Sequence, residues 1–141
     1  MRSSHFALVT LIAATITASA DIGENEKQIE ARYGKPAKIM NEQGKFRVVG
    51  YLSGGFMILV DFVNGTSQRE GFASPDTSAL SKDDVDRILA MTTPPGLKWE
   101  ELPEKDGARL WNRSDWKAIA TVSADGRYFS VRDPNFVQPE K

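Results

Sequence analysis

Hydrophobic and polar positions along the chain predict a helix followed by strands, and this order occurs twice. Apolar residues three or four positions apart predict helices over Asn25–Tyr33 and Lys82–Met91, and alternating patterns predict strands after each helix. The strands expected in the first half are Ala37–Met40, Phe46–Leu52, Phe56–Val63 and Thr66–Phe72. Those expected in the second half are Lys98–Glu101, Ala108–Arg113, Lys117–Ser123 and Arg127–Arg132.

Local signals mark where both helices begin. Asn25 with Gln28, and Ser81 with Asp84, have the three-residue spacing of a capping box. In such a box the first side chain accepts a hydrogen bond from the helix backbone, and the second accepts one in return. We therefore expect both helices to start at these residues.

Similarity between the halves predicts a duplication. Asn-Gly at 64–65 and Asp-Gly at 125–126 predict type I′ hairpin turns at equivalent places. The alternative is that any helix-plus-hairpin segment has this pattern. One half could not bury both a helix and a sheet face alone. We therefore predict an α+β fold in which a tandem repeat of a helix plus antiparallel strands forms one sheet of about eight strands, with two helices packed on one face.

The length of 141 residues predicts one domain. We expect residues 21–141 to form it, with half-repeats 21–78 and 79–133. Two prolines in 134–141 predict an extended C-terminal tail, which Phe136 would dock onto the core.

Residues 1–20 have the pattern of a secretory signal peptide. Arg2 supplies the positive start, a short apolar stretch follows, and Ala18-Ser19-Ala20 is an A-x-A cleavage site. The apolar stretch is too short to span a bilayer as a helix, and no other segment could span one. We expect cleavage after Ala20 and a periplasmic or secreted protein. The alternative is an uncleaved N-terminal anchor.

The composition excludes several kinds of site. The chain has no cysteine, one histidine (His5) and a net charge of −1. Without the leader no histidine remains, which excludes histidine triads, cysteine nucleophiles, disulfides and the usual zinc and haem ligands. We expect no metal, no cofactor and no nucleic-acid partner. Small secreted eukaryotic proteins usually carry disulfides, so the lack of cysteine favours a bacterial exported protein.

Strand alternation assigns residues to the two faces of the sheet. The helices are expected to cover Leu52, Phe56, Ile58, Val60, Phe62, Leu110, Trp116, Ala118, Ala120, Val122, Phe129 and Val131. The other face is expected to show Arg47, Val49, Tyr51, Met57, Leu59, Asp61, Arg109, Trp111, Arg113, Lys117, Ile119, Tyr128 and Arg132. This second set is too apolar for a solvated face and too charged for a core, so it predicts a binding surface.

The candidate partner-binding residues lie on that second face. They are Arg47, Tyr51, Met57, Arg109, Trp111, Arg113, Lys117, Tyr128 and Arg132. Tyrosine, tryptophan and arginine are enriched in binding hot spots, and the cations favour an acidic partner or a carboxylate ligand. We predict a non-enzymatic module that binds another exported or cell-envelope protein. Two alternatives stay open: the face binds a small ligand, or the arginines only cover neighbouring rings.

No arrangement of residues favours catalysis. Ser114 and Lys117 have a Ser-x-x-Lys spacing, but that motif needs a helix and this segment is predicted to be a hairpin turn. Aspartates at the start of the second helix complement its dipole. Glu100, Glu101 and Glu104 indicate a solvated loop rather than a catalytic carboxylate pair. A small hydrolase is the least favoured alternative.

The first helix carries a motif, Gly23-x-Asn25-x-x-Gln28-Ile29-x-x-x-Tyr33-Gly34-x-Pro36. It is similar to the helix motif of the SmpA/OmlA (BamE-like) outer-membrane assembly lipoproteins, and the tandem layout resembles the β-lactamase inhibitor protein family. The resemblance implies helices on one face of an eight-stranded sheet and protein–protein binding through the open face. The chain departs from the pattern because its second half lacks Gly-x-Pro. The lipobox cysteine is also missing, so no lipid anchor is expected.

Overall fold

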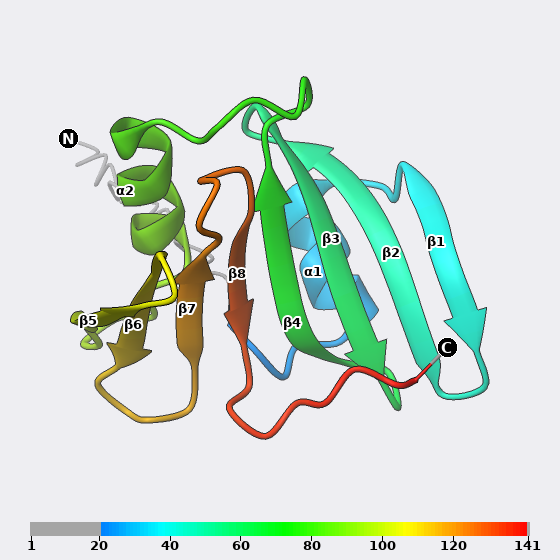
Figure 1. Cartoon of the computed structure of the whole chain (residues 1–141). Helices are drawn as coiled ribbons and strands as arrows, with labels where there is room; N and C mark the ends of the chain where they lie inside the picture. The colour runs from blue at the N-terminus through cyan, green and yellow to red at the C-terminus, as the bar shows by residue number, and fades with distance from the viewer. Residues whose placement is uncertain (1–20, 141) are drawn as a thin grey trace, which may run out of the picture.

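One antiparallel sheet of eight strands forms the framework of the molecule (Figure 1). The computed structural model describes residues 21–140, so the predicted signal peptide and its cleavage site lie outside the described residues. In the first half, α1 (Glu26–Tyr33) is followed by β1 (Lys38–Gln43), β2 (Phe46–Ser53), β3 (Phe56–Val63) and β4 (Thr66–Ala73). In the second half, α2 (Lys82–Met91) is followed by β5 (Trp99–Lys105), β6 (Ala108–Arg113), β7 (Ile119–Val122) and β8 (Phe129–Arg132).

The two halves join through their last strands. The strand order is β1-β2-β3-β4-β8-β7-β6-β5, with β4 and β8 antiparallel in the middle. The first strands, β1 and β5, therefore form the two outer edges. This arrangement confirms the predicted α+β fold with two helices and one open eight-stranded sheet.

Both predicted capping boxes are present. The Asn25 side chain accepts a hydrogen bond from the backbone N–H of Gln28, and the Gln28 side chain accepts one from Asn25. Ser81 and Asp84 make the same reciprocal pair at α2. These bonds satisfy helix N–H groups that have no partner within the helix.

The type I′ turns are only partly as predicted. Asn64 and Gly65 both have positive φ, 52° and 79°, as this turn requires. In the second half, Asp106 and Gly107 at the β5–β6 hairpin have these angles, 53° and 79°. The predicted turn at 125–126 is different, because only Gly126 has a positive φ there. The Asp125 carboxylate closes that turn instead, accepting from the Ser123 hydroxyl and the Arg127 N–H.

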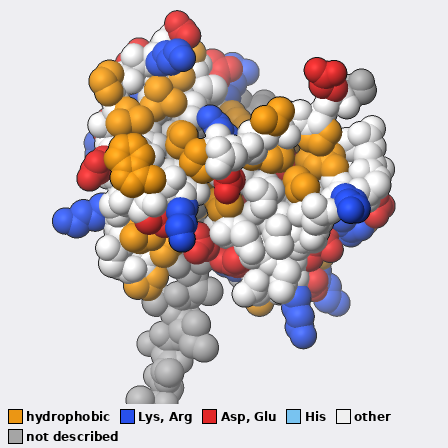
Figure 2. Space-filling view, turned by 90° about the horizontal axis from the view of Figure 1, so that it is seen from below, with side chains coloured by type: hydrophobic (Ala, Val, Ile, Leu, Met, Phe, Trp, Pro, Cys, Tyr) orange, Lys and Arg blue, Asp and Glu red, His pale blue; other side chains and the backbone are white. Residues whose placement is uncertain are grey.

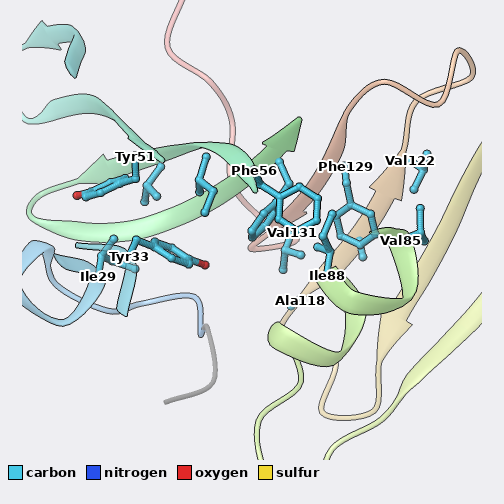
Figure 3. Close-up of a cluster of buried hydrophobic side chains, with 14 of the residues drawn as sticks. Ile29, Tyr33, Tyr51, Phe56, Val85, Ile88, Ala118, Val122, Phe129 and Val131 are labelled. Carbon is cyan, nitrogen blue, oxygen red and sulfur yellow. The ribbon is translucent and has the colours of Figure 1, made fainter. Parts of the chain in front are cut away.

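A single hydrophobic core lies between the sheet and the two helices (Figure 3). Ile29 and Tyr33 of α1 and Val85 and Ile88 of α2 are buried against it. A row of aromatic side chains with neighbouring centroids 5.9–6.4 Å apart crosses the junction between the halves. Its members are Tyr51, Tyr33, Phe72, Phe129 and Trp111. The two halves therefore share one core.

Several predicted face assignments were wrong. Leu52 is 62% exposed on the far side of the sheet, and Trp116 is 73% exposed in a turn. Leu110 pairs with Thr121 on the far side. Conversely, Val49, predicted to be open, is fully buried in the core. The other predicted core positions on β3, β7 and β8, together with Ala118, are buried as expected.

Hairpin register explains these errors. The two-residue turn after β2 places Ser53 opposite Phe56, so Tyr51 lies opposite Ile58 and shares its face. In β6, Trp111 likewise lies opposite Ala120. Directly paired residues of antiparallel strands lie on the same face, so a shift by one position reverses a whole strand.

In residues 21–140, no helix is long and apolar enough to cross a membrane.

Candidate functional site

Three predicted binding residues are buried rather than open. Tyr51 and Trp111 are 1% and 4% exposed within the core, so their assignment to the open face was wrong. Arg113 is only 3% exposed, and its guanidinium is held by two carboxylates. These side chains offer no free surface to a partner.

Two further arginines lie on the helix-covered side. The Arg47 Nε atom lies 2.6 Å from Glu26 Oε1 of α1, so this residue holds the helix onto the sheet. The Arg109 guanidinium lies 4.7 Å from the ring centroid of Trp111 and pairs with Glu101 at 3.0 Å. Arg109 therefore covers an aromatic ring, as one of the alternatives predicted.

The remaining predicted residues are dispersed. Met57 is 37% exposed on the open face. Tyr128 and Arg132 are half-buried, and Arg132 donates to the backbone oxygens of Asp133 and Pro134. Lys117 is exposed in the β6–β7 connection. The structure does not bring the nine predicted residues together into one site.

The Ser-x-x-Lys segment is a turn, as predicted. Ser114 Oγ accepts a hydrogen bond from the Lys98 N–H at 3.0 Å, which fixes the hydroxyl to the residue before β5. The acidic residues of β5 correct another expectation, because Glu101 and Glu104 lie in an exposed edge strand rather than in a loop. Within residues 21–140, no group of three acidic or histidine side chains is arranged to hold a metal ion.

An apolar groove lies on the open face of β1–β3. In Figure 1, α1 lies behind these strands and no helix covers their near side. A hollow of about 260 Å³ is lined by Met40, Leu52, Met57 and Leu59, together with Ala37, Lys38, Gly50 and Tyr51. Gly50 lies beneath the hollow, where a Cβ atom would come within 3.6 Å of Leu59 and 3.8 Å of Met40. Of the predicted binding residues, Met57 exposes its side chain at this groove, whereas Tyr51 borders it but is only 1% exposed.

The middle of the same face is filled by side chains. Tyr128 lies directly over Gly71, where an added Cβ would meet the phenol oxygen at 1.8 Å. Asp61 is buried and ion-paired with Arg69 at 2.5 Å, and burial raises the pKa of this carboxyl. The Phe136 ring packs on the Arg69 guanidinium, 5.5 Å from its centroid. The tail thus docks on the open face rather than on the core.

A polar cavity of about 730 Å³ lies at one end of the sheet, near the junction of the halves. It is lined by residues 21–23, Gln68 of β4, Arg113 at the end of β6, residues 115–117 of the β6–β7 connection, and residues 133–135 after β8. Figure 2 looks onto this end of the molecule, where apolar, basic and acidic side chains are intermixed.

Arg113 fixes one wall of this cavity. Its Nε and Nη2 atoms bond both carboxylate oxygens of Asp115 at 2.8 and 2.9 Å, and Nη1 bonds Asp21 at 3.0 Å. A bidentate pair of this kind sets the relative orientation of the two groups. The guanidinium lowers the pKa of Asp115, which therefore stays ionised. Arg113 thus ties the β6–β7 connection to the segment before α1.

A buried charge cluster lies beneath α1. Glu70, on the helix-covered face of β4, is 1% exposed between Val60 and Val131. Tyr33 Oη donates to Glu70 Oε2 at 3.3 Å, and Arg32 lies 3.5 Å from Glu70 Oε1. Arg32 also pairs with Glu24. Burial raises the pKa of Glu70 to about 7.

Neither concave surface was predicted from the sequence pattern. Met40, predicted to end a strand, had no predicted role, although Met40, Leu52 and Met57 form an exposed patch once the register is set correctly. Trp116 was assigned to the core because it continues the alternation of Ala118 and Ala120. The detectable signal was the connection around it: five residues, 114–118, separate β6 from β7, which is long enough to leave the strand pattern.

Comparison with known proteins identifies no family. No family model matches the chain, and no curated protein matches it. One similar solved structure is a cysteine-rich secretory protein from Staphylococcus aureus, with 9% identity over 80% of this chain and 44% of that one, at a TM-score of 0.46. Another is an extracellular protein containing a SCP domain from Bacillus anthracis, with 11% identity over 95% and 50%, at a TM-score of 0.45.

This chain spans about half the length of those two structures. The resemblance to the SmpA/OmlA lipoproteins and to the β-lactamase inhibitor protein was wrong, because no family model matches the chain.

Proposed function

We propose that the chain is an exported, non-enzymatic binding domain that holds an extended segment of another exported protein on the open face of β1–β3. The observation that carries this proposal is the apolar groove. Met40, Leu52 and Met57 are 51%, 62% and 37% exposed and lie together on a face that no helix covers. Clustered exposed apolar side chains mark interaction sites, and methionine adapts its shape to different partners.

The size of the groove favours a protein segment over a small molecule. Ligand pockets usually measure roughly 300–1,000 Å³. The groove, at about 260 Å³, is smaller and open, so it suits one or two apolar side chains.

The neighbouring edge strand supports an extended partner. All six residues of β1 are exposed, and its outer backbone groups have no strand beside them. An added strand can pair with such an edge and place alternate side chains over the sheet. The other edge strand, β5, contains Pro103, which lacks an N–H. Lys38 beside the groove favours an acidic residue next to the apolar ones.

The leader pattern of residues 1–20 supports export. The apolar groove, the free edge of β1 and Lys38 together predict the sequence of the partner segment: large apolar residues two positions apart and an acidic neighbour.

Selection from a phage-displayed library of random peptides, against the purified protein, tests the proposal. We expect peptides of this pattern, with binding measured by calorimetry. The Leu52→Asp variant should weaken their binding at least tenfold. Leu102→Asp is the matched control, because Leu102 is 41% exposed on the distant strand β5. Equal losses in both variants, or a library that yields no such peptide, would show that the groove is not the binding site.

A further inference from the structure

Trp116 is placed in an unusual way at the polar cavity. Its side chain is 73% exposed, although tryptophan gains most from burial. It lines the cavity with Gln68, Asp115, Lys117, Asp133 and Asn135. Neither the core nor the apolar groove uses this ring.

The backbone at Trp116 is strained as well. Its φ is +62°, in the left-handed region that glycine and asparagine tolerate and bulky residues avoid. Two hydrogen bonds hold the turn: the Trp116 N–H donates to the Arg113 oxygen at 2.9 Å, and the Lys117 N–H donates to Asp115 Oδ1 at 3.1 Å. A turn alone would favour glycine or asparagine here, so the stability of the turn does not explain the ring.

The lining of the cavity carries two cations and three carboxylates, a net charge of −1. Arg113 is fully engaged by Asp115 and Asp21, which leaves Lys117 and Asp133 of opposite sign. The one cation and one carboxylate outside the Arg113 network leave no strong excess of either sign for an ion, which favours an uncharged polar ligand. The volume of about 730 Å³ lies in the usual range for ligand sites.

We infer that this cavity is a binding site for a neutral oligosaccharide. The C–H face of a sugar ring is apolar and stacks on an exposed indole, while its hydroxyl groups need donors and acceptors around the rim. Trp116 supplies the stacking surface. The amides of Gln68 and Asn135 and the carboxylate of Asp133 supply hydrogen-bonding groups of both kinds. The Arg113–Asp115 pair fixes the loop that carries the ring, which lowers the entropic cost of binding.

Titration with defined neutral oligosaccharides tests this inference. The probes are the hexasaccharides of maltose, cellulose, xylan and chitin type, and the readouts are calorimetry and tryptophan fluorescence. Trp116 is far more exposed than Trp111, so a bound sugar should shift the emission and protect it from acrylamide quenching. We expect at least one probe to bind with a Kd in the micromolar to millimolar range.

Three variants assign the binding to this site. Trp116→Asn should weaken it at least tenfold and still fold, because asparagine tolerates the left-handed backbone. Trp116→Phe should retain part of the affinity, since a ring remains. Leu52→Asp, in the apolar groove, should leave sugar binding unchanged, so failure here is distinguishable from failure of the proposed peptide site. Absence of binding to all four probes, or binding that survives Trp116→Asn, would overturn the inference.

Discussion

Glu70 carries the most unusual environment of any described carboxyl group. Its neighbours across the sheet are Val60 and Val131, and α1 closes over it with Tyr33 and Arg32. Removal from water disfavours the charged form, and burial is the main cause of its raised pKa, about 7 against an ordinary value of 4.5. Between these two pH values the folded chain binds more protons than the unfolded chain.

The stability of the protein should therefore depend on Glu70 in a defined direction. When folding raises the pKa of a carboxyl group, the free energy of unfolding of the protein falls as the pH rises from the unfolded pKa to the folded pKa. Relative to wild type, Glu70→Gln should become more stable between pH 5 and pH 8, by more than about 1 kcal/mol, because one pKa unit is worth roughly 1.4 kcal/mol. Urea unfolding at several pH values measures this. Glu104→Gln, at an exposed position on β5, should show no such trend.

Gly71 and Tyr128 should be energetically coupled. Gly71→Ala places a Cβ within 1.8 Å of the Tyr128 oxygen, so the ring must move. Overpacking of this kind costs typically about 1–3 kcal/mol. In a Tyr128→Ala background the same change should cost less than about 1 kcal/mol. A double-mutant cycle from chemical denaturation gives the coupling, and a zero coupling would contradict the contact.

At the scale of elements, local signals predicted helix starts well. Asn25 and Ser81 begin the helices because each satisfies a backbone N–H that the helix leaves free, and that requirement is visible in four consecutive residues. The Asn64-Gly65 turn was predictable because it too depends on only a few consecutive residues. The ends of strands were harder to predict. The strand expected to end at Glu101 continues as β5 to Lys105 through Pro103, which an edge strand tolerates.

The capping residue of α2 gives a direct test of this local control. Ser81→Ala should lower the free energy of unfolding by about 1 kcal/mol, because the N–H of Asp84 loses its acceptor. Ser81→Gly should cost only a few tenths of that, since glycine leaves the N–H open to water. Thermal unfolding followed by circular dichroism measures both variants. Equal losses would show that the hydroxyl is not the stabilising group.

The face of each strand was the main element-level failure, and it determined the candidate site. Alternation tells which residues share a face within a strand, but only the turn tells how that face relates to the next strand. The Gly54-Gly55 turn pairs Ser53 with Phe56, which sends Tyr51 into the core and Leu52 outward. The mixed surface of rings and arginines predicted from sequence therefore does not exist as one face. The exposed groove depends on strand pairing across β1, β2 and β3, which no local pattern specifies.

At the scale of the whole molecule, the predicted architecture is confirmed, because it follows from the need of all the elements together to bury their apolar faces. Two amphipathic helices and eight short strands need one shared core, and the aromatic row from Tyr51 to Trp111 provides it across the β4–β8 junction. The halves should therefore unfold together rather than separately.

The positions of the tryptophans allow a test. All three, at 99, 111 and 116, lie in the second half, so fluorescence reports on that half, while far-UV circular dichroism reports on both. We expect the two signals to give the same midpoint in urea. Phe72→Ala, in the first half beside the junction, should shift both midpoints together, with a loss of roughly 3–5 kcal/mol. A fluorescence transition that stays in place while the other moves would show that the halves are independent.

The central position of β8 has a consequence for the order in which the protein is made. β8 follows the other seven strands of the sheet in the sequence, yet it lies in the middle of the sheet, between β4 and β7. Until it emerges, both of these neighbours expose unpaired edges, and the two half-sheets have nothing to hold them side by side. A nascent chain therefore cannot reach its final form in stages from the amino terminus. A chain cut before Phe129 would lose the strand that joins the two half-sheets rather than a strand at the edge.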